Sequence, residues 1–244
     1  MREVVVNAIP PLTSKPESLG QMVYDAIRDA IVEQLIPPGS PVSEAELARQ
    51  LGVSKTPVRE ALLRLQTIGL VEPAGPRGAR VVLPSDELLR HAYEVRAALE
   101  SGVARLAAAH ATGEQTEAIV DAARRSMECA EREEITGFQE WDRRFHRLTA
   151  GACDNARLVE LVDNAATLAR ILRDRDGPTP GDAMRCAQHH IDIAAAIERG
   201  DRRRAADSAS QHVDFVYQMV LEARHVKHGA ADGLAPAATT VGSR

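Results

Sequence analysis

The chain has 244 residues, a formal net charge of −5 and only 3% aromatic residues. This length accommodates two modest domains with separate cores, and the negative balance excludes a protein coated in positive potential, so any contact with nucleic acid must be local. The scarcity of aromatic rings disfavours recognition of RNA or single strands by base stacking, which leaves duplex DNA as the better candidate.

The first part of the chain predicts an arm followed by two helices. Residues 1–16 hold three prolines and little periodicity, which indicates a flexible N-terminal arm. A helix then begins near Ser18 and stops before Pro37-Pro38-Gly39, a run that cannot continue a helix. A second, short helix follows Ser43, which stands three residues before Glu46 in a capping-box pattern.

A third helix is expected between Gly52 and Gly69, and its two sides differ in character. Apolar residues at helical spacing mark a buried side, namely Val58, Ala61, Leu62 and Leu65. Ser54 or Thr56 can cap the helix, and Pro57 lies in its first turn, where a missing N–H costs nothing. A short helix with a polar, cationic first half, preceded by another short helix and a glycine turn, is typical of a helix-turn-helix reader of DNA. An ordinary solvated basic face is the alternative.

Two short strands are expected at residues 70–73 and 80–83, on either side of a stretch rich in turn formers. Three helices and a β-hairpin make a winged helix-turn-helix domain, which we assign to residues 17–84. Arg77 at the tip of the hairpin could contact phosphate or the minor groove, although an exposed arginine at a tip is unremarkable by itself.

Everything beyond Pro84-Ser85-Asp86 reads as helical, with Ser85 or Asp86 as the first cap. Residues 85–227 are rich in alanine and show no strand-like alternation, so the protein is predicted to be mainly α, with an all-α antiparallel bundle as its second domain. Helix breakers divide this domain into six segments, at approximately residues 86–111, 114–133, 136–151, 155–173, 181–199 and 201–226. Residues 228–244 hold few large apolar side chains and indicate a disordered tail.

The three cysteines, Cys129, Cys153 and Cys186, are widely separated and form no C-x-x-C pair. Their spacing predicts reduced thiols and argues against a disulfide framework or a cysteine-rich zinc site. The N-terminus shows no signal-peptide pattern, and no stretch approaches the roughly 20 apolar residues that a membrane span requires. We therefore expect a soluble, cytoplasmic protein.

Four residues that can bind metal fall on inward faces of the bundle. Asp142 and His146 stand four apart and project from one helix face, where they could chelate a divalent ion. His190 and His212 lie on apolar stripes of two later helices, whereas His189 points about 100° away, toward solvent. A histidine on an apolar stripe is more often a core residue hydrogen-bonded to a backbone carbonyl, so ligation and a purely structural role both stay open here.

Arg96, on the first helix of the bundle, also admits two interpretations. If it turns inward, its guanidinium could hold the carboxylate of a small ligand bidentately. If it turns outward, it forms a surface salt bridge with Glu100 one turn later. Periodicity alone does not decide between them.

The run Val53-Ser54-Lys55-Thr56-Pro57-Val58-Arg59-Glu60-Ala61-Leu62 is a highly specific motif, and with it the first half resembles the DNA-binding domain of the GntR transcription factors. The second half resembles the FCD ligand-binding domain of the FadR-like subfamily. Its matching pieces are Glu94-x-Arg96-x-x-Leu99-Glu100, Asp142-x-x-Phe145-His146, Asn155-x-x-Leu158, His190-x-x-Ile193 and His212. Together the two resemblances cover residues 18 to 226 approximately.

The resemblance implies roles for these residues. It places a divalent transition metal, most commonly zinc, with nickel or manganese as alternatives, on Asp142, His146, His190 and His212, and it favours His190 over His189. It also implies a small organic acid as effector, bound at these same ligands together with Arg96 and Asn155. The residues it assigns to DNA binding are Ser54, Lys55, Thr56, Pro57, Arg59, Arg64, Arg77 and Gly78. This chain departs from the family pattern at Ala45, where relatives often carry a DNA-contacting arginine, and at Lys55, which replaces the commoner arginine.

These observations predict a ligand-responsive transcription regulator, a repressor that binds a palindromic operator as a homodimer. Arg59 is expected to read a guanine edge, and Lys55 and Arg77 to contact phosphates or groove walls. The alternative is a metal-dependent hydrolase or lyase acting on a small carboxylate, because three histidines and an aspartate could activate water. Against an enzyme, no further acidic residue stands at motif spacing as an obvious general base.

Overall fold

The computed structural model describes residues 19–75, 78–173 and 178–232, the last six of these by their backbone alone. The chain divides into two compact units, residues 1–82 and 83–244, each described by itself below. This division falls two residues before the one expected at 84/85. The expected arm at residues 1–16 and Arg77 lie outside the described residues.

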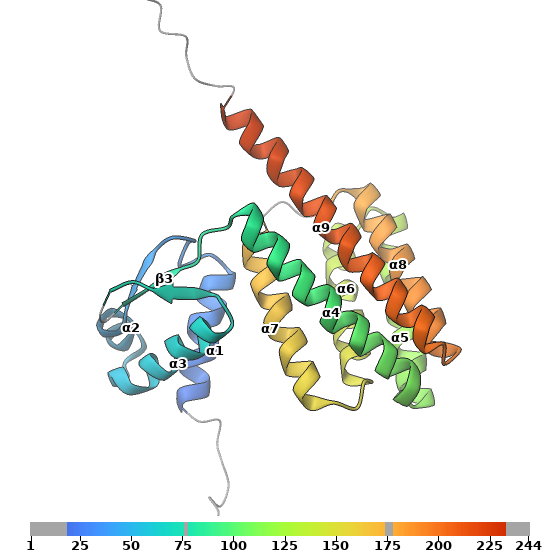
Figure 1. Ribbon diagram of the computed structural model, residues 1–244, viewed down its shortest axis with the longest axis horizontal. Coiled ribbons are helices and arrows are strands. Elements are labelled where there is room, and N and C mark those ends of the chain that lie inside the picture. Colours follow the sequence, from blue (N-terminus) through green and yellow to red (C-terminus); the bar gives the residue numbers. More distant parts are fainter. Residues whose placement is uncertain (1–18, 76–77, 174–177, 233–244) are drawn as a thin grey trace, which may run out of the picture. The chain divides into compact units, whose positions relative to one another are not determined.

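The N-terminal unit is a winged helix-turn-helix with a small antiparallel sheet (Figure 1). Its described elements are the helices α1 (Leu19–Val32), α2 (Glu44–Leu51) and α3 (Lys55–Thr67) and the strands β1 (Pro41–Ser43), β2 (Val71–Pro73) and β3 (Gly78–Val81). The strands follow the order β1-β3-β2, with Val42 facing Ala79 and Glu72 facing Arg80. The hairpin of β2 and β3 confirms the prediction, whereas β1 is an additional strand that the sequence pattern did not indicate.

The core of this unit is formed where α3 packs on α1 and the sheet. The four apolar residues that the sequence assigned to the buried side of α3 are all buried: Val58, Ala61, Leu62 and Leu65. Ile27 and Ile31 of α1 and Val81 of β3 are equally inaccessible to solvent. Because burying such a side chain stabilises the fold by about 1.5–3 kcal/mol, this small core fixes α3 as a rigid element.

The turn between α2 and α3 depends on Gly52. This residue adopts φ 65°, in the left-handed region that favours glycine, and its N–H closes the end of α2. Ser54 then precedes α3 in an extended conformation, but its side chain makes no capping hydrogen bond. The capping box predicted for Ser43 and Glu46 is also wrong, because Ser43 makes no side-chain cap and the Glu46 carboxylate accepts from Arg49 and Gln50 instead.

The second unit is all helical in its described residues. Its helices are α4 (Asp86–His110), α5 (Gly113–Glu131), α6 (Ile135–Gly151), α7 (Ala156–Leu172), α8 (Pro180–Glu198) and α9 (Arg202–Asp232). Their side-chain caps include Ser85, Thr112, Asn155 and Thr179, each of which accepts a hydrogen bond from a backbone N–H three residues later. The helix α9 continues to Asp232, so residues 228–232 of the expected tail are helical, and the remainder of that tail lies outside the described residues.

The bundle packs through small side chains. The helix α4 runs along α9 on one side of the unit, and α5 lies against α6 and α8 on the other (Figure 1). Alanines dominate the main core cluster, in which Ile119, Phe145, Ile193 and Ile197 are the larger members. Since alanine lets helix axes approach closely, polar side chains on α4, α6, α8 and α9 can meet inside the bundle. All three cysteines are free, and within the described ranges no helix is long and apolar enough to cross a membrane.

Candidate functional site

Three histidines from three helices meet inside the helical unit. They are His146 of α6, His190 of α8 and His212 of α9, and one nitrogen from each lies within 4.8 Å of the others. His190 and His212 are completely buried, with 0% and 1% exposure, while His146 is partly exposed. The convergence of inward histidines predicted from the sequence is therefore present in the fold.

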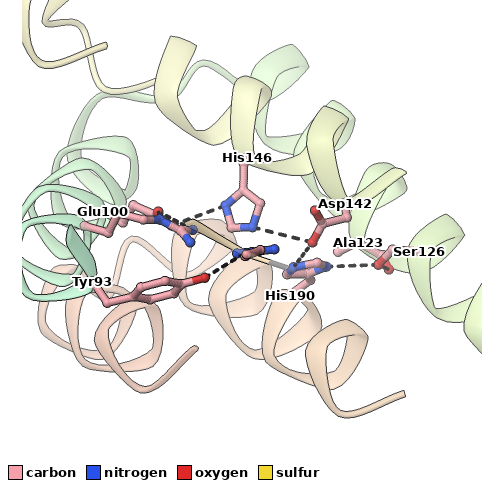
Figure 2. A network of polar contacts seen from close by, with 9 residues as sticks. Tyr93, Glu100, Ala123, Ser126, Asp142, His146 and His190 are labelled. Carbon is pink, nitrogen blue, oxygen red and sulfur yellow. Dashed lines mark hydrogen bonds and ion pairs between the residues drawn. The ribbon is translucent and has the colours of Figure 1, made fainter. Parts of the chain in front are cut away.

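Asp142 completes the set. Its Oδ1 lies 3.4 Å from Nε2 of His190 and 3.7 Å from Nε2 of His146, so one carboxylate oxygen faces both rings. Figure 2 shows Asp142, His146 and His190 pointing toward one another from α6 and α8. For comparison, Zn–N bonds of about 2.0–2.1 Å place neighbouring ligand atoms of a tetrahedral site about 3.4 Å apart.

Two neighbours orient the rings. The hydroxyl of Ser126 donates to the carbonyl of Ala123 at 2.8 Å, so its oxygen is left to accept the proton on Nδ1 of His190 at 3.2 Å. Glu100 lies 3.4 Å from Nδ1 of His146 in the same manner (Figure 2). In both rings Nδ1 is thereby turned to a protein partner and Nε2 is left with a lone pair facing Asp142, the arrangement that outer partners impose on metal-binding histidines.

Two ring nitrogens in the site are buried and lack a hydrogen-bond partner among the described residues, Nε2 of His190 and Nδ1 of His212. Leaving a buried polar atom unpaired costs on the order of 1–3 kcal/mol, which calls for an explanation such as a bound ion. In the described part of the chain, neither nitrogen meets the backbone carbonyl that the purely structural interpretation requires. Three imidazoles and a carboxylate instead fit a divalent transition metal.

The protonation states also suit ligation. Burial lowers the pKa of His190 to about 3 and that of His212 well below its ordinary value, so both imidazoles are neutral at neutral pH. Burial raises the pKa of the Asp142 carboxyl, but His146, His190 and the guanidinium groups of Arg173 and Arg96 together outweigh it and leave the pKa below its usual range. The site therefore offers neutral nitrogens and an ionised oxygen, as metal binding requires.

Arg96 combines parts of both interpretations offered above. It turns inward, with 6% exposure, and it also pairs with Glu100, whose Oε1 accepts from its Nε at 2.8 Å and lies 2.6 Å from its Nη2. Burial alone would lower the pKa of Arg96, but Glu100 and Tyr93 raise the pKa above its ordinary value and keep the guanidinium charged. Because Glu100 also contacts His146, Arg96 is joined to the histidines through one carboxylate.

The sequence did not single out Tyr93, Ser126 or Arg173. The Tyr93 hydroxyl accepts from Nε of Arg173 at 2.7 Å and is directed toward the histidines (Figure 2). Tyr93 stands three residues before Arg96 and so shares its helix face, which is a signal that could have been used. Arg173 follows the last residue of α7, and Ser126 lies on α5 far along the chain from His190, so no local pattern points to either.

One predicted detail of the site, the orientation of His189, differs in the structure. His189 does not face solvent alone, because it is partly buried and its ring edge contacts His212 and Phe215 at centroid distances of 5.8 and 5.3 Å. Asn155 lies exposed at the start of α7, where its Oδ1 accepts from the N–H of Leu158 at 3.1 Å. The structure thus gives Asn155 a capping role and does not bring it to the buried histidines, and its contact with an effector stays a prediction.

In the N-terminal unit, five of the residues expected to contact DNA lie at or near the start of α3. Ser54, Lys55 and Thr56 are exposed there, and Pro57 lies in the first turn as predicted. Arg59 is 62% exposed and forms an ion pair with Glu44 of α2, with Nε 3.0 Å from Oε1 and Nη2 2.9 Å from Oε2.

The other predicted DNA contacts lie further from this helix start. The Arg64 guanidinium is 3.8 Å from the ring centre of Tyr24 and donates to Gln21, so it is held against α1. Gly78 begins β3 opposite Ser43, and a Cβ added to it would lie 3.1 Å from the carbonyl oxygen of Ala74. Ala45 is exposed on α2, where it offers no polar group.

Residues 19–81 match the gntR family of bacterial regulatory proteins, and residues 91–215 match the FCD domain. The chain belongs to the GntR family, with an FCD domain. It is 30% identical to the HTH-type transcriptional repressor RspR of Escherichia coli strain K12 over 85% of this chain and 91% of that protein. It is also 34% identical to a probable D-xylose utilization operon transcriptional repressor of Paenarthrobacter nicotinovorans, over 78% of this chain and 85% of the relative.

Solved structures agree with this assignment. A putative GntR transcriptional regulator from Rhodococcus sp. RHA1 superposes with a TM-score of 0.61 and 26% identity, over 84% of this chain and 99% of that one. This GntR-family protein is therefore a DNA-binding transcription regulator and not an enzyme, and the hydrolase or lyase alternative is set aside.

Proposed function

We propose that this regulator is a repressor that binds a palindromic operator as a homodimer and releases or retains it in response to a small organic acid sensed at a metal site. The observation that carries the sensing half is the convergence of His146, His190 and His212 within 4.8 Å, with Asp142 facing two of them. The assignment as a repressor is supported by two relatives whose names describe repressors.

The DNA-binding half of the proposal rests on α3. Its exposed start carries Lys55 and Thr56, and Arg59 projects from the same end with most of its side chain in solvent. An arginine at this place in a recognition helix can donate both terminal groups to O6 and N7 of a guanine. Two such helices related by twofold symmetry would read two half-sites about one helical turn apart, which accounts for the palindrome.

The metal half rests on the donor set. Asp142, His146, His190 and His212 would hold one divalent transition ion, zinc in the first place and nickel or manganese as alternatives. A bound ion would supply a Lewis-acidic centre to which a carboxylate of the effector can bind. Arg96, buried beside the same site and charged, would add a guanidinium to the effector pocket, with Asn155 as a further contact expected from the family motif.

The proposal is tested by thermal unfolding of the metal-loaded and the chelator-treated protein in the presence of small organic acids. An acid that binds through the metal raises the melting temperature of the loaded protein only, because a ligand stabilises the state that binds it. The same acid should change the affinity of the loaded protein for its operator.

A double variant, His190→Ala with His212→Ala, supplies the negative arm, and His110→Ala supplies the control because His110 is exposed at the end of α4. Stabilisation by the acid that persists in the double variant, or that is equal with and without metal, would contradict a metal-bridged effector.

A further inference from the structure

We infer that Arg173, held by Tyr93, is a second carboxylate-binding group of the effector pocket, so that the effector is a dicarboxylate rather than a monocarboxylate. This inference rests on the proposed function, since it names the class of acid that the metal site senses. It concerns residues for which the family motifs give no role in this chain.

The position of Arg173 follows from its contacts. It is the residue directly after α7, with φ −76° and ψ 141°, so the backbone leaves the helix there in an extended conformation. Its Nε donates to the Tyr93 hydroxyl at 2.7 Å, and its guanidinium carbon lies 5.7 Å from the centre of the Tyr93 ring. Tyr93 is 3% exposed and its hydroxyl points toward His146 and His190 in Figure 2, so Arg173 is brought next to the histidine cluster.

Arg173 and Arg96 contact the same tyrosine. Tyr93 links the two arginines, because the Arg96 guanidinium carbon also lies over its ring, at 5.1 Å from the centre. Two guanidinium groups therefore flank one buried tyrosine beside the candidate metal ligands.

The two arginines differ in what they have left to donate. In Arg96, Nε and Nη2 are both paired with the carboxylate of Glu100. In Arg173, Nε donates to the Tyr93 hydroxyl. Across residues 19–75, 78–173 and 178–226 no carboxylate lies close enough to form an ion pair with Arg173. Guanidinium groups donate five N–H bonds in a planar fork suited to a carboxylate, and among the described residues no carboxylate occupies the terminal nitrogens of Arg173.

Charge balance favours a ligand with two negative charges. Among the described residues of the site, the positive charges of Arg96 and Arg173 are matched by the negative charges of Glu100 and Asp142, and ligation would keep the histidines neutral. A divalent ion would add two positive charges to a largely buried space. A dicarboxylate would neutralise them, with one carboxylate on the metal side and the other at Arg173, whereas a monocarboxylate would leave an uncompensated buried charge, which is costly.

The test compares matched acids on the metal-loaded, full-length protein by isothermal titration calorimetry. The probes are pairs that differ in one carboxylate, namely succinate with butyrate, glutarate with valerate, and malate with 3-hydroxybutyrate. The expected result is that at least one diacid binds about tenfold or more tightly than its partner, as the gain of a charge-assisted contact predicts. In Arg173→Gln that preference should vanish while metal content and binding of the monoacid are unchanged.

Three further variants sharpen the result. Arg173→Lys keeps the charge and should retain part of the preference, and Tyr93→Phe should weaken it, because it removes the hydroxyl that positions the guanidinium. Arg157→Gln, on the helix α7 that precedes Arg173, is the matched control, since the Arg157 side chain is 88% exposed and pairs only with Glu160 among the described residues.

The inference is overturned if no diacid is preferred by the wild type, or if the preference survives in Arg173→Gln. Either result, obtained on protein that binds metal and responds to an acid, leaves the proposed function standing. A wild-type protein that takes up no metal would instead overturn the proposed function itself.

Discussion

The guanidinium of Arg59 lies against the carboxylate of Glu44, with Nη2 2.9 Å from Oε2. This ion pair joins α3 to α2 across the turn at Gly52 and leaves Arg59 largely exposed near the start of α3. Glu44 is the better shielded partner, with 17% side-chain exposure against 62% for Arg59. Glu44 can thus hold Arg59 in place while the N–H groups of Arg59 that do not face Glu44 stay accessible to a base.

Replacing Arg59 by alanine should lower operator affinity and relax sequence preference. A bidentate contact to guanine discriminates against the wrong base by about tenfold or more, and that discrimination is lost with the guanidinium. Fluorescence anisotropy on the operator and on a scrambled duplex of equal length measures the effect. Arg49→Ala is the control, because Arg49 is an exposed arginine of α2 that is paired with Glu46. Equal affinity of Arg59→Ala and wild type for the operator would show that Arg59 does not contact a base.

Replacing Lys55 by alanine should have a different signature. Lys55 is exposed at the first position of α3, where it can neutralise a phosphate. Loss of one phosphate contact reduces the slope of log affinity against log salt by about 1 and weakens binding to all sequences alike. Titrations at several salt concentrations on specific and scrambled duplexes give the slope. A changed base preference with an unchanged slope would assign Lys55 to a base instead.

Replacing Ser126 by alanine should weaken metal binding without unfolding the protein. Ser126 is fully buried and its oxygen accepts from Nδ1 of His190, which directs Nε2 of that ring to the proposed metal position. Loss of such an outer partner typically lowers metal affinity by about 10–100-fold. Competition with a chromophoric chelator measures the affinity, and circular dichroism checks the fold. Ser208→Ala, at a buried serine of α9, is the control, and an unchanged affinity in Ser126→Ala would remove Ser126 from the site.

The metal-free protein should become less stable as the pH falls below neutrality. Burial lowers the pKa of His190 to about 3, whereas the unfolded chain binds a proton at a pKa of about 6.5. Between these values the unfolded state holds more protons, so the free energy of unfolding falls with falling pH, by at most about 1.4 kcal/mol per pH unit for this one group. Urea unfolding of chelator-treated protein at pH 7, 6 and 5 provides the measurement.

Two variants test whether His190 causes the pH dependence. His190→Gln should reduce the slope, whereas His110→Ala should keep it, because His110 is exposed at the end of α4. A free energy of unfolding that is flat from pH 7 to pH 5 in the wild type would mean that the buried histidines accept protons in the folded state.

Local patterns in the sequence predicted most of the fold. The apolar spacing on α3 and the cap at Ser85 could be predicted, because both depend on residues within a few positions of each other. The strand β1 was not predicted, because its three residues form a strand only by pairing with β3, which lies far along the chain. The capping box at Ser43 failed since Glu46 had a competing partner, Arg49, one turn later.

The candidate site was predictable in part for the same reason. Periodicity turned Asp142, His146, His190 and His212 inward, and the structure brings them together. Periodicity did not decide whether Arg96 points inward or outward. Its partner Glu100 lies on the same helix face, so the two side chains are buried together. Ser126 and Arg173 contact residues of other helices, and these contacts depend on how the helices pack. The local spacing of residues in the sequence therefore does not predict them.

The central claim is that four side chains of the helical unit hold one metal ion. Elemental analysis by mass spectrometry of the purified protein, after incubation with zinc, nickel or manganese and gel filtration, tests it most directly. The account predicts about one equivalent of a divalent transition metal per protomer in the wild type and in His110→Ala. It also predicts almost complete loss in a His190→Ala, His212→Ala double variant that keeps its helical spectrum. Retention of the metal by that double variant, or a wild type that binds none of the three ions, would contradict the account.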